Sequence, residues 1–196
     1  MSMTKSITGL VCGILTQQGV LDVEKFVTAY VPGMEGTQYE KVTVRECLDM
    51  RSGNAFDDSS PAYRKAWAWI PLNSDDKPTD LHQFISTFEW VPAPKADGLE
   101  GAAFDYNSAN TDLVGWVVER ATGKKFADLV SELIWQPMGA ESDAYVTVDR
   151  AGSARAAGGM CATVRDIARL GQLVLHDDNG VVPIGWINNM LNNGPK

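Results

Sequence analysis

The sequence predicts a single helix-dominated domain spanning residues 1–196, and three observations carry that prediction. A chain of 196 residues is long enough for one domain with a sizeable core. Apolar residues recur at helical spacing in several separate segments, of which residues 2–18 are the first. The alternation typical of a strand is clear only at residues 144–148. We therefore expect helices to form most of the fold.

Residues 2–18 form the first expected helix, whose apolar stripe should face the core. The stripe consists of Ile7, Leu10, Val11, Ile14 and Leu15. Gly19 is expected to end this helix, because glycine readily adopts the left-handed conformation found after helices. A capping box at residues 43–46 (TVRE) then opens a second helix, which we expect to end near residues 52–53.

The region from residue 54 to residue 105 is the least regular part of the sequence. It contains Pro61, Pro71, Pro78, Pro92 and Pro94. Because proline interrupts helices and central strands, we expect a long loop there, with short helices near residues 66–69 and 81–88. Long loops of this kind often carry function.

Helical spacing returns after this loop. Asn110 or Thr111 is placed to cap a helix that Gly123 ends, and a further helix should run from Phe126 to about Pro137. The last clear helix opens at residues 163–166 (TVRD), and its expected buried residues are Ile167, Leu170, Val174 and Leu175.

Composition excludes two classes of protein. The formal net charge of −8 argues against a nucleic-acid binder, which needs a basic face to meet phosphates. No apolar run approaches the roughly 20 residues of a membrane-spanning helix. Cys12 and Cys47 lie in apolar helical patterns, so we expect them to be reduced core residues. Reduced cysteines favour the cytoplasm, whereas a missing upstream signal segment would make the periplasm the compartment.

A serine and a lysine stand three residues apart at the start of the first helix. In residues 2–5 (SMTK), this spacing puts Ser2 and Lys5 on one helix face, so the amine can reach the hydroxyl. A serine nucleophile needs such an adjacent base. Partial burial favours the neutral form of an amine, which can then take the proton. Ser2 is equally well placed to be an ordinary N-cap.

Four segments in the same order resemble the class C β-lactamase, DD-peptidase and esterase family of penicillin-recognising serine hydrolases. Residues 2–9 (SMTKSITG) are similar to the family's S-x-T-K-S-x-T-G. Residues 42–53 resemble its ITVRHLLTHTSG stretch, and residues 104–110 (FDYNSAN) resemble its Y-x-N segment. Residues 157–170 are similar to its AGGM-x-x-T-x-x-D-L-A-R stretch.

The resemblance implies a role for each matching position. Ser2 would be acylated, Lys5 would share in taking its proton, and Tyr106 would be the second general acid and base. Ser108 stands where the family has the asparagine of Y-x-N, so it would be a substrate-binding residue with a weaker demand on the substrate. This departure points toward the carboxylesterase and nylon-oligomer hydrolase branch. The family needs no metal or organic cofactor.

The implied fold is α+β, of the β-lactamase and DD-peptidase type. Its N-terminal strands and its C-terminal K-T-G-type strand have no counterpart in these 196 residues. We therefore expect a helix-dominated chain in which most of the central antiparallel sheet is missing. The apolar stripes of the first and last helices would then lack a partner, which favours self-association or pairing with a sheet-supplying chain.

Two functions remain open. The first is a serine hydrolase that forms an acyl-enzyme with a small-molecule ester or amide, a β-lactam included. The alternative is a catalytically inactive truncated homologue that serves as a scaffold or binding module. We expect no catalytic role for His82 or His176. Packing is the expected role of Trp67, Trp69 and Trp90, with the lining of a substrate cleft as the alternative.

Overall fold

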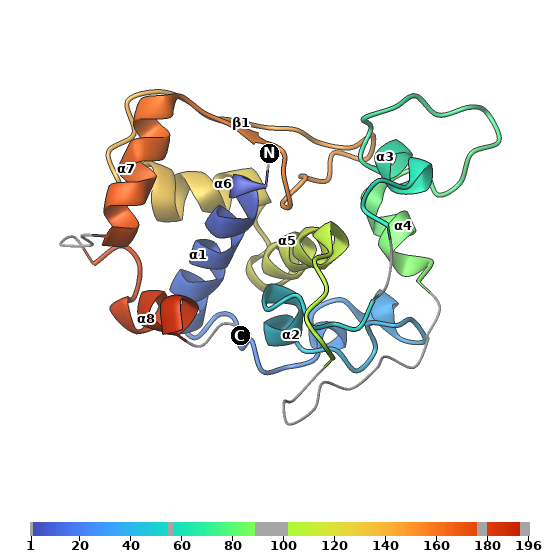
Figure 1. Ribbon diagram of the computed structural model, residues 1–196, viewed down its shortest axis with the longest axis horizontal. Helices are drawn as coiled ribbons and strands as arrows, with labels where there is room; N and C mark the ends of the chain where they lie inside the picture. The colour runs from blue at the N-terminus through green and yellow to red at the C-terminus, as the bar shows by residue number, and fades with distance from the viewer. Residues whose placement is uncertain (1, 55–56, 89–101, 176–179, 193–196) are drawn as a thin grey trace.

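The computed structural model describes residues 2–54, 57–88, 102–175 and 180–192. Helices dominate these residues, as predicted, and α1 (Met3–Gln17) lies among the others (Figure 1). Three elements pack against it: α5 (Ser108–Thr122), α6 (Phe126–Val130) and the π-helical turn η3 (Ser131–Trp135). The amino end of α1 is therefore held in place by neighbours that are distant in the sequence.

The apolar stripe of α1 is buried by the chain itself. The exposed fraction of its residues is at most 6%, the value for Ile14. Trp186 closes a further side, since a Cβ atom added at Gly13 would lie 2.4 Å from its indole ring. The expectation that the first stripe lacks a partner is wrong, because α5, α6 and η3 cover it.

The capping box at residues 43–46 is confirmed. The Glu46 backbone N–H donates to Thr43 Oγ1 at 3.1 Å, and the Thr43 backbone N–H donates to Glu46 Oε2 at 2.7 Å. The helix that it opens, α2 (Val44–Leu48), is shorter than expected and packs against α5. It stops early because Met50 takes a left-handed φ of 57°, which turns the chain toward α5.

The irregular region holds α3 (Pro61–Ala66) and α4 (Leu81–Ser86), after the 3-10 turns η1 (Val27–Ala29) and η2 (Pro32–Met34). The predicted helix at 66–69 is misplaced, because Pro61 starts α3 rather than interrupting it. Proline suits the first turn of a helix, where its missing N–H costs nothing. Ser60 caps α3 by accepting from the Tyr63 backbone N–H at 3.3 Å.

Helix α5 begins earlier than predicted. Its N-cap is Asn107, whose side-chain oxygen accepts from the Ala109 N–H at 2.9 Å, rather than Asn110 or Thr111. Its end at Gly123, with a φ of 71°, is as predicted. Because the helix starts at Ser108, the candidate substrate-binding residue is its first residue.

Two strands form one small antiparallel sheet, β1 (Tyr145–Val146) with β2 (Met160–Cys161). Helices α7 (Val164–Leu175) and α8 (Ile184–Asn192) follow. The predicted last helix is confirmed as α7, but the expected burial of Leu175 is wrong, since it is 76% exposed. Neither β2 nor α8 was predicted. Over the described ranges, the prediction of many helices and little sheet is confirmed.

Two further expectations concern burial and membranes. Cys12 and Cys47 are buried free thiols, as predicted, and burial raises the pKa of Cys12 to about 12. Cys161 is exposed. None of the helices in the described part of the chain has the length and apolar character needed to cross a bilayer.

Candidate active site

Ser2, Lys5 and Tyr106 lie together at the amino end of α1. Ser2 is exposed and is the N-cap of the helix, and Lys5 Nζ donates to its Oγ at 3.4 Å. The same amine lies 4.9 Å from the centroid of the Tyr106 ring. The spacing of the first pair is local, but Tyr106 reaches them from the loop before α5. The structure thus brings together the three residues predicted to be catalytic.

A backbone carbonyl holds the Lys5 amine in place. Lys5 Nζ donates to the Ala157 carbonyl oxygen at 2.8 Å. The threonines on either side of Lys5 bind the same segment: Met160 N–H donates to Thr4 Oγ1 at 3.1 Å, and Thr8 Oγ1 donates to the Ala156 carbonyl at 2.9 Å. The polar face of α1 therefore binds residues 156–160 along its first two turns.

The electrostatic setting of Tyr106 favours its phenolate. Partial burial raises the pKa of this tyrosine, but hydrogen bonds with Lys5 and Ser2 and the charge of Lys5 outweigh that effect. The net result is a pKa below the ordinary value of 10.0. The side chain is 48% exposed, so it remains open to a substrate. Tyr106 is thus placed to exchange a proton with Ser2.

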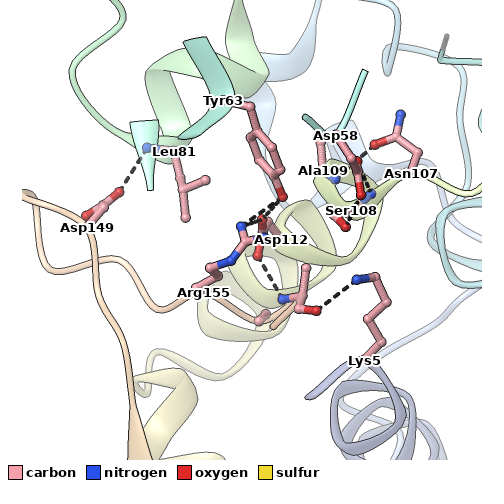
Figure 2. Close-up of polar contacts among 12 residues, drawn as sticks. Lys5, Asp58, Tyr63, Leu81, Asn107, Ser108, Ala109, Asp112, Asp149 and Arg155 are labelled. Carbon is pink, nitrogen blue, oxygen red and sulfur yellow. Dashed lines mark hydrogen bonds and ion pairs between the residues drawn. The ribbon is translucent and has the colours of Figure 1, made fainter. Parts of the chain in front are cut away.

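Ser108 lies next to this group but is already engaged. Its hydroxyl and its backbone N–H both donate to the carboxylate of Asp58, the latter at 2.9 Å (Figure 2). Its exposed fraction is 4%. Asp58 is also close enough for its negative charge to act against the phenolate of Tyr106. The preceding residue, Asp57, acts only locally, because its carboxylate accepts from the backbone N–H and the hydroxyl of Ser59.

A buried polar cluster of Asp112, Tyr63 and Arg155 lies near the half-buried Lys5 (Figure 2). Asp112 Oδ2 accepts from the Tyr63 hydroxyl at 2.5 Å and from Arg155 Nη1 at 3.3 Å. Its Oδ1 accepts from the Ala157 N–H at 2.8 Å. Burial raises the pKa of Asp112, while Arg155 and these hydrogen bonds oppose the rise. The Arg155 guanidinium also lies over Trp67, 3.8 Å from its ring centroid.

A cavity of about 290 Å³ borders Lys5, between α1, α2, α5 and α8. Its lining combines apolar side chains with three charged ones, the basic Lys5 and Arg45 and the acidic Asp49. The lining includes Leu48, Met50, Phe104, Trp186, Met190, Arg45 and Asp49.

The remaining candidates contribute less. His82 stacks on Trp116 with ring centroids 3.8 Å apart, and its pKa is lowered, chiefly by burial. Trp67 is buried beneath Arg155, which fits the packing role, while Trp69 is 60% exposed beside it. His176 and Trp90 lie outside the described residues. In the described ranges, no group of three or more acidic, histidine or cysteine side chains is arranged to hold a metal ion.

Sequence reasoning missed the residues behind the site: Asp58, Tyr63, Asp112, Arg155 and Ala157. One signal was available for Asp112, which precedes the apolar residues Leu113 and Val114 and yet carries a charge. A charge within a buried helix stripe implies a partner elsewhere in the fold. The partner itself comes from another segment, so spacing alone could not identify it.

Comparisons with known proteins agree with this geometry. The model of the Beta-lactamase family matches residues 1–194. The 6-aminohexanoate-dimer hydrolase of Paenarthrobacter ureafaciens is 34% identical over 209 residues, covering 100% of this chain and 51% of that protein. The chain thus spans about half the length of this curated relative.

Solved structures show the same fold. A candidate 6-aminohexanoate-dimer hydrolase from Bacillus anthracis superimposes with a TM-score of 0.86 and 27% identity, covering 97% of this chain and 52% of the other. The octameric penicillin-binding protein homologue from Pyrococcus abyssi gives a TM-score of 0.71 at 21% identity, covering 96% and 47% respectively. Since the family model spans nearly every residue and the Ser2, Lys5 and Tyr106 side chains converge, the chain belongs to the Beta-lactamase family.

Proposed function

We propose that this chain carries the catalytic centre of a serine hydrolase that cleaves an amide or ester through an acyl-enzyme. The observation that carries the proposal is the meeting of Ser2, Lys5 and Tyr106 from two distant parts of the chain. An exposed hydroxyl with an amine and a phenol within reach meets the requirements for nucleophilic catalysis. Membership of the Beta-lactamase family supports the same reaction class.

In the proposed mechanism, Ser2 Oγ attacks the carbonyl carbon of the substrate. Its proton passes to the neutral amine of Lys5 or to the phenolate of Tyr106, whichever is the base in the bound complex. The tetrahedral intermediate collapses as the C–N or C–O bond breaks, and the leaving amine or alcohol takes the proton from Tyr106. Water then repeats the sequence on the Ser2 ester, releases the acid and restores the hydroxyl.

For the substrate, we propose a short linear amide, and we expect esters of similar shape to be hydrolysed as well. The relative from Paenarthrobacter ureafaciens is named for the dimer of 6-aminohexanoate, an aliphatic chain with charged ends. The cavity beside Lys5 has an apolar wall that includes Leu48 and Phe104, and Arg45 and Asp49 also line it. An apolar chain with a charged end matches both features.

Ser108 is proposed to contribute to substrate binding in a restricted way. Its hydroxyl proton is committed to Asp58, so only the lone pairs of its oxygen are left for a substrate N–H. Replacing Ser108 by asparagine adds a donor and should move the kcat/KM ratio toward nitrocefin and away from a butyrate ester. A wild-type chain that prefers nitrocefin to the ester would contradict this specificity.

The experiment that tests the proposed function is covalent labelling. A fluorophosphonate should modify Ser2 alone, and mass spectrometry of the digested protein locates the adduct. Ser2→Ala should abolish the label, while Ser74→Ala, at an exposed serine of the loop between α3 and α4, should leave it unchanged. A folded chain without label on Ser2 would favour the alternative, an inactive homologue that serves as a scaffold or binding module.

We also propose that the chain self-associates. Leu175 at the end of α7 and Ile184 and Leu191 on α8 are each more than two-thirds exposed. Clustered exposed apolar side chains are typical of surfaces that bind protein. One structural relative is described as octameric. Sedimentation of the wild type against Leu175→Glu tests this, and a monomer at all concentrations would refute it.

A further inference from the structure

The buried cluster of Asp112, Tyr63 and Arg155 does not reach a substrate, yet it connects to the Lys5 amine through one residue. Ala157 donates its N–H to Asp112 Oδ1 at 2.8 Å, and its carbonyl oxygen accepts from Lys5 Nζ at 2.8 Å. The N–H and the carbonyl belong to two adjoining peptide planes, which meet at the Ala157 Cα atom. The first plane therefore fixes the position of the shared Cα atom, and only φ and ψ of Ala157 separate it from the second plane.

We propose that Asp112 is a positioning residue: its carboxylate fixes the Ala157 backbone, whose carbonyl in turn holds the Lys5 amine against Ser2 and Tyr106. The inference rests on the proposed function, since it assigns a purpose to the place where Lys5 is held. Asp112 itself touches neither the substrate cavity nor the three reacting groups.

The carboxylate is suited to this purpose because it cannot move. Its side chain is 1% exposed, and its second oxygen is held by the Tyr63 hydroxyl and by Arg155 Nη1. Arg155 is fixed in turn by the ring of Trp67, 3.8 Å away. Figure 2 shows this group lying behind the loop that Lys5 approaches from the opposite side. The cluster thus forms a rigid support for the Ala157 peptides.

The peptide unit that Asp112 holds has a second support, because the Ala156 carbonyl and the Ala157 N–H belong to the same unit. Thr8 Oγ1 holds the Ala156 carbonyl, and Thr4 Oγ1 accepts from Met160 N–H. Both threonines belong to α1, the helix that carries Lys5. Asp112 is the support of this segment that comes from α5. Without it, the Ala156–Ala157 peptide unit keeps the bond from Thr8 but loses the support on its other edge, so the adjoining Ala157 carbonyl is held less firmly toward Lys5.

The test compares two double variants that remove the buried charges and differ in one property. Arg155→Met with Asp112→Asn keeps an oxygen that accepts from Ala157 N–H. Arg155→Met with Asp112→Leu keeps the number and branching of the side-chain heavy atoms at position 112 without an acceptor. A buried ion pair can often be replaced by neutral groups without loss of the fold. Arg155 Nε is buried with no hydrogen-bond partner among the described residues, so methionine also removes an unsatisfied donor.

The expected result is a fall in kcat without a change in substrate binding. For hydrolysis of p-nitrophenyl butyrate, the leucine variant should have a kcat about 10- to 100-fold below that of the asparagine variant, with KM within about twofold. Equal kcat values in the two variants, or a change confined to KM, would overturn the proposal. Cooperative urea unfolding of both variants is the condition for the comparison, and alanine replaces leucine at position 112 if that variant fails it.

A structural readout separates this proposal from the proposed function. In crystals of the asparagine variant, Lys5 Nζ should remain within hydrogen-bonding distance of the Ala157 carbonyl, and in crystals of the leucine variant it should not. If the wild type neither labels at Ser2 nor turns over ester, the proposed function fails while this readout still decides the role of Asp112. A Lys5 amine in the same place in both variants would overturn the positioning role.

Discussion

Two clusters of this protein pair a tyrosine with a cation, and their chemistry is opposite. In the exposed cluster, Lys5 lies 4.9 Å from the ring centroid of Tyr106, whose pKa is lowered. In the buried cluster, Arg155 lies 5.0 Å from the ring centroid of Tyr63, whose pKa is raised well above its ordinary value. The distance between ring and cation is nearly the same, so it does not explain the difference.

Burial and a third charge explain it. Burial is the largest influence on the pKa of Tyr63, and the carboxylate of Asp112 adds to it by accepting the phenolic proton. Tyr106 is half exposed, and the charge of Lys5 affects its pKa more than that of Asp58 does. A tyrosine beside a cation becomes an acid–base group only where water or a substrate can take its proton. The buried cluster gives up reactivity and gains a fixed shape.

The largest expected effect comes from breaking the buried cluster alone. Arg155→Met leaves the Asp112 carboxylate without its cation and should lower the free energy of unfolding by about 3–5 kcal/mol. The matched control is Arg165→Met, because the Arg165 side chain is 84% exposed and lies 3.9 Å from Glu141. That control should change stability by less than about 0.5 kcal/mol. Urea denaturation followed by circular dichroism measures both, and equal effects would show that Arg155 is not an ionic partner.

A smaller effect on stability is expected at Gly115, where α5 contacts the segment that holds Lys5. A Cβ atom at Gly115 would lie 2.5 Å from the Cβ of Ala156, so Gly115→Ala must displace the segment that holds Lys5. We expect a loss of about 1–3 kcal/mol in stability and lower ester turnover. Gly171→Ala is the control, since nothing lies within 4 Å of its added Cβ in α7.

That control should gain about 0.4–1 kcal/mol, because alanine restricts the unfolded chain more than glycine does. Thermal unfolding of the two variants side by side gives both signs in one experiment. If Gly115→Ala also gained stability, the contact between α5 and Ala156 would be looser than the structure has it.

The smallest change in stability is expected from Tyr106→Phe, within about 0.5 kcal/mol, because the ring stays and only an exposed hydroxyl is lost. Its effect lies in the titration. As pH rises, tyrosinate absorbance should first appear below pH 10 in the wild type, and this first component should be missing in the variant.

The pKa values of the two buried tyrosines are raised rather than lowered, so they make the stability of the fold depend on pH. Tyr39 and Tyr63 keep their protons in the folded state above pH 10, whereas the unfolded chain releases them there. The unfolded state then binds fewer protons, so the free energy of unfolding should fall as pH rises through 10. Stability that stays level across this range would contradict the assigned burial of the two hydroxyl groups.

Local patterns in the sequence predicted the local parts of the site. The three-residue spacing of Ser2 and Lys5 fixes their shared helix face, and the capping box before α2 satisfies its backbone groups within four residues. The long-range parts were less accessible. The proximity of Tyr106 to Lys5 was predicted from the family resemblance and not from spacing. No local pattern in the sequence indicates that Asp112 pairs with Arg155.

The errors in the fold have equally specific causes. Pro61 was counted as a breaker, although at the first position of α3 it starts a helix. Helix α8 buries Ile187, and such a small buried face leaves little helical periodicity in the sequence. Its position depends on the contact between Trp186 and Gly13, which the sequence does not reveal. Strand β2 has two residues, which is too short for alternation to be seen.

The bonds between α1 and residues 156–160 also determine when the site can form during translation. Lys5 and Ala157 are 152 positions apart, and Thr4 and Met160 are 156 apart. At roughly 5–20 residues per second, α1 leaves the ribosome about 8–30 s before the segment that it binds. Throughout that time Lys5 and the two threonines have not yet met residues 156–160, although α5, α6 and η3, which cover the apolar stripe, are made earlier. The bonds that hold the Lys5 amine and the two threonines therefore form only after residues 156–160 have been made, later than the contacts of α1 with α5 and α6.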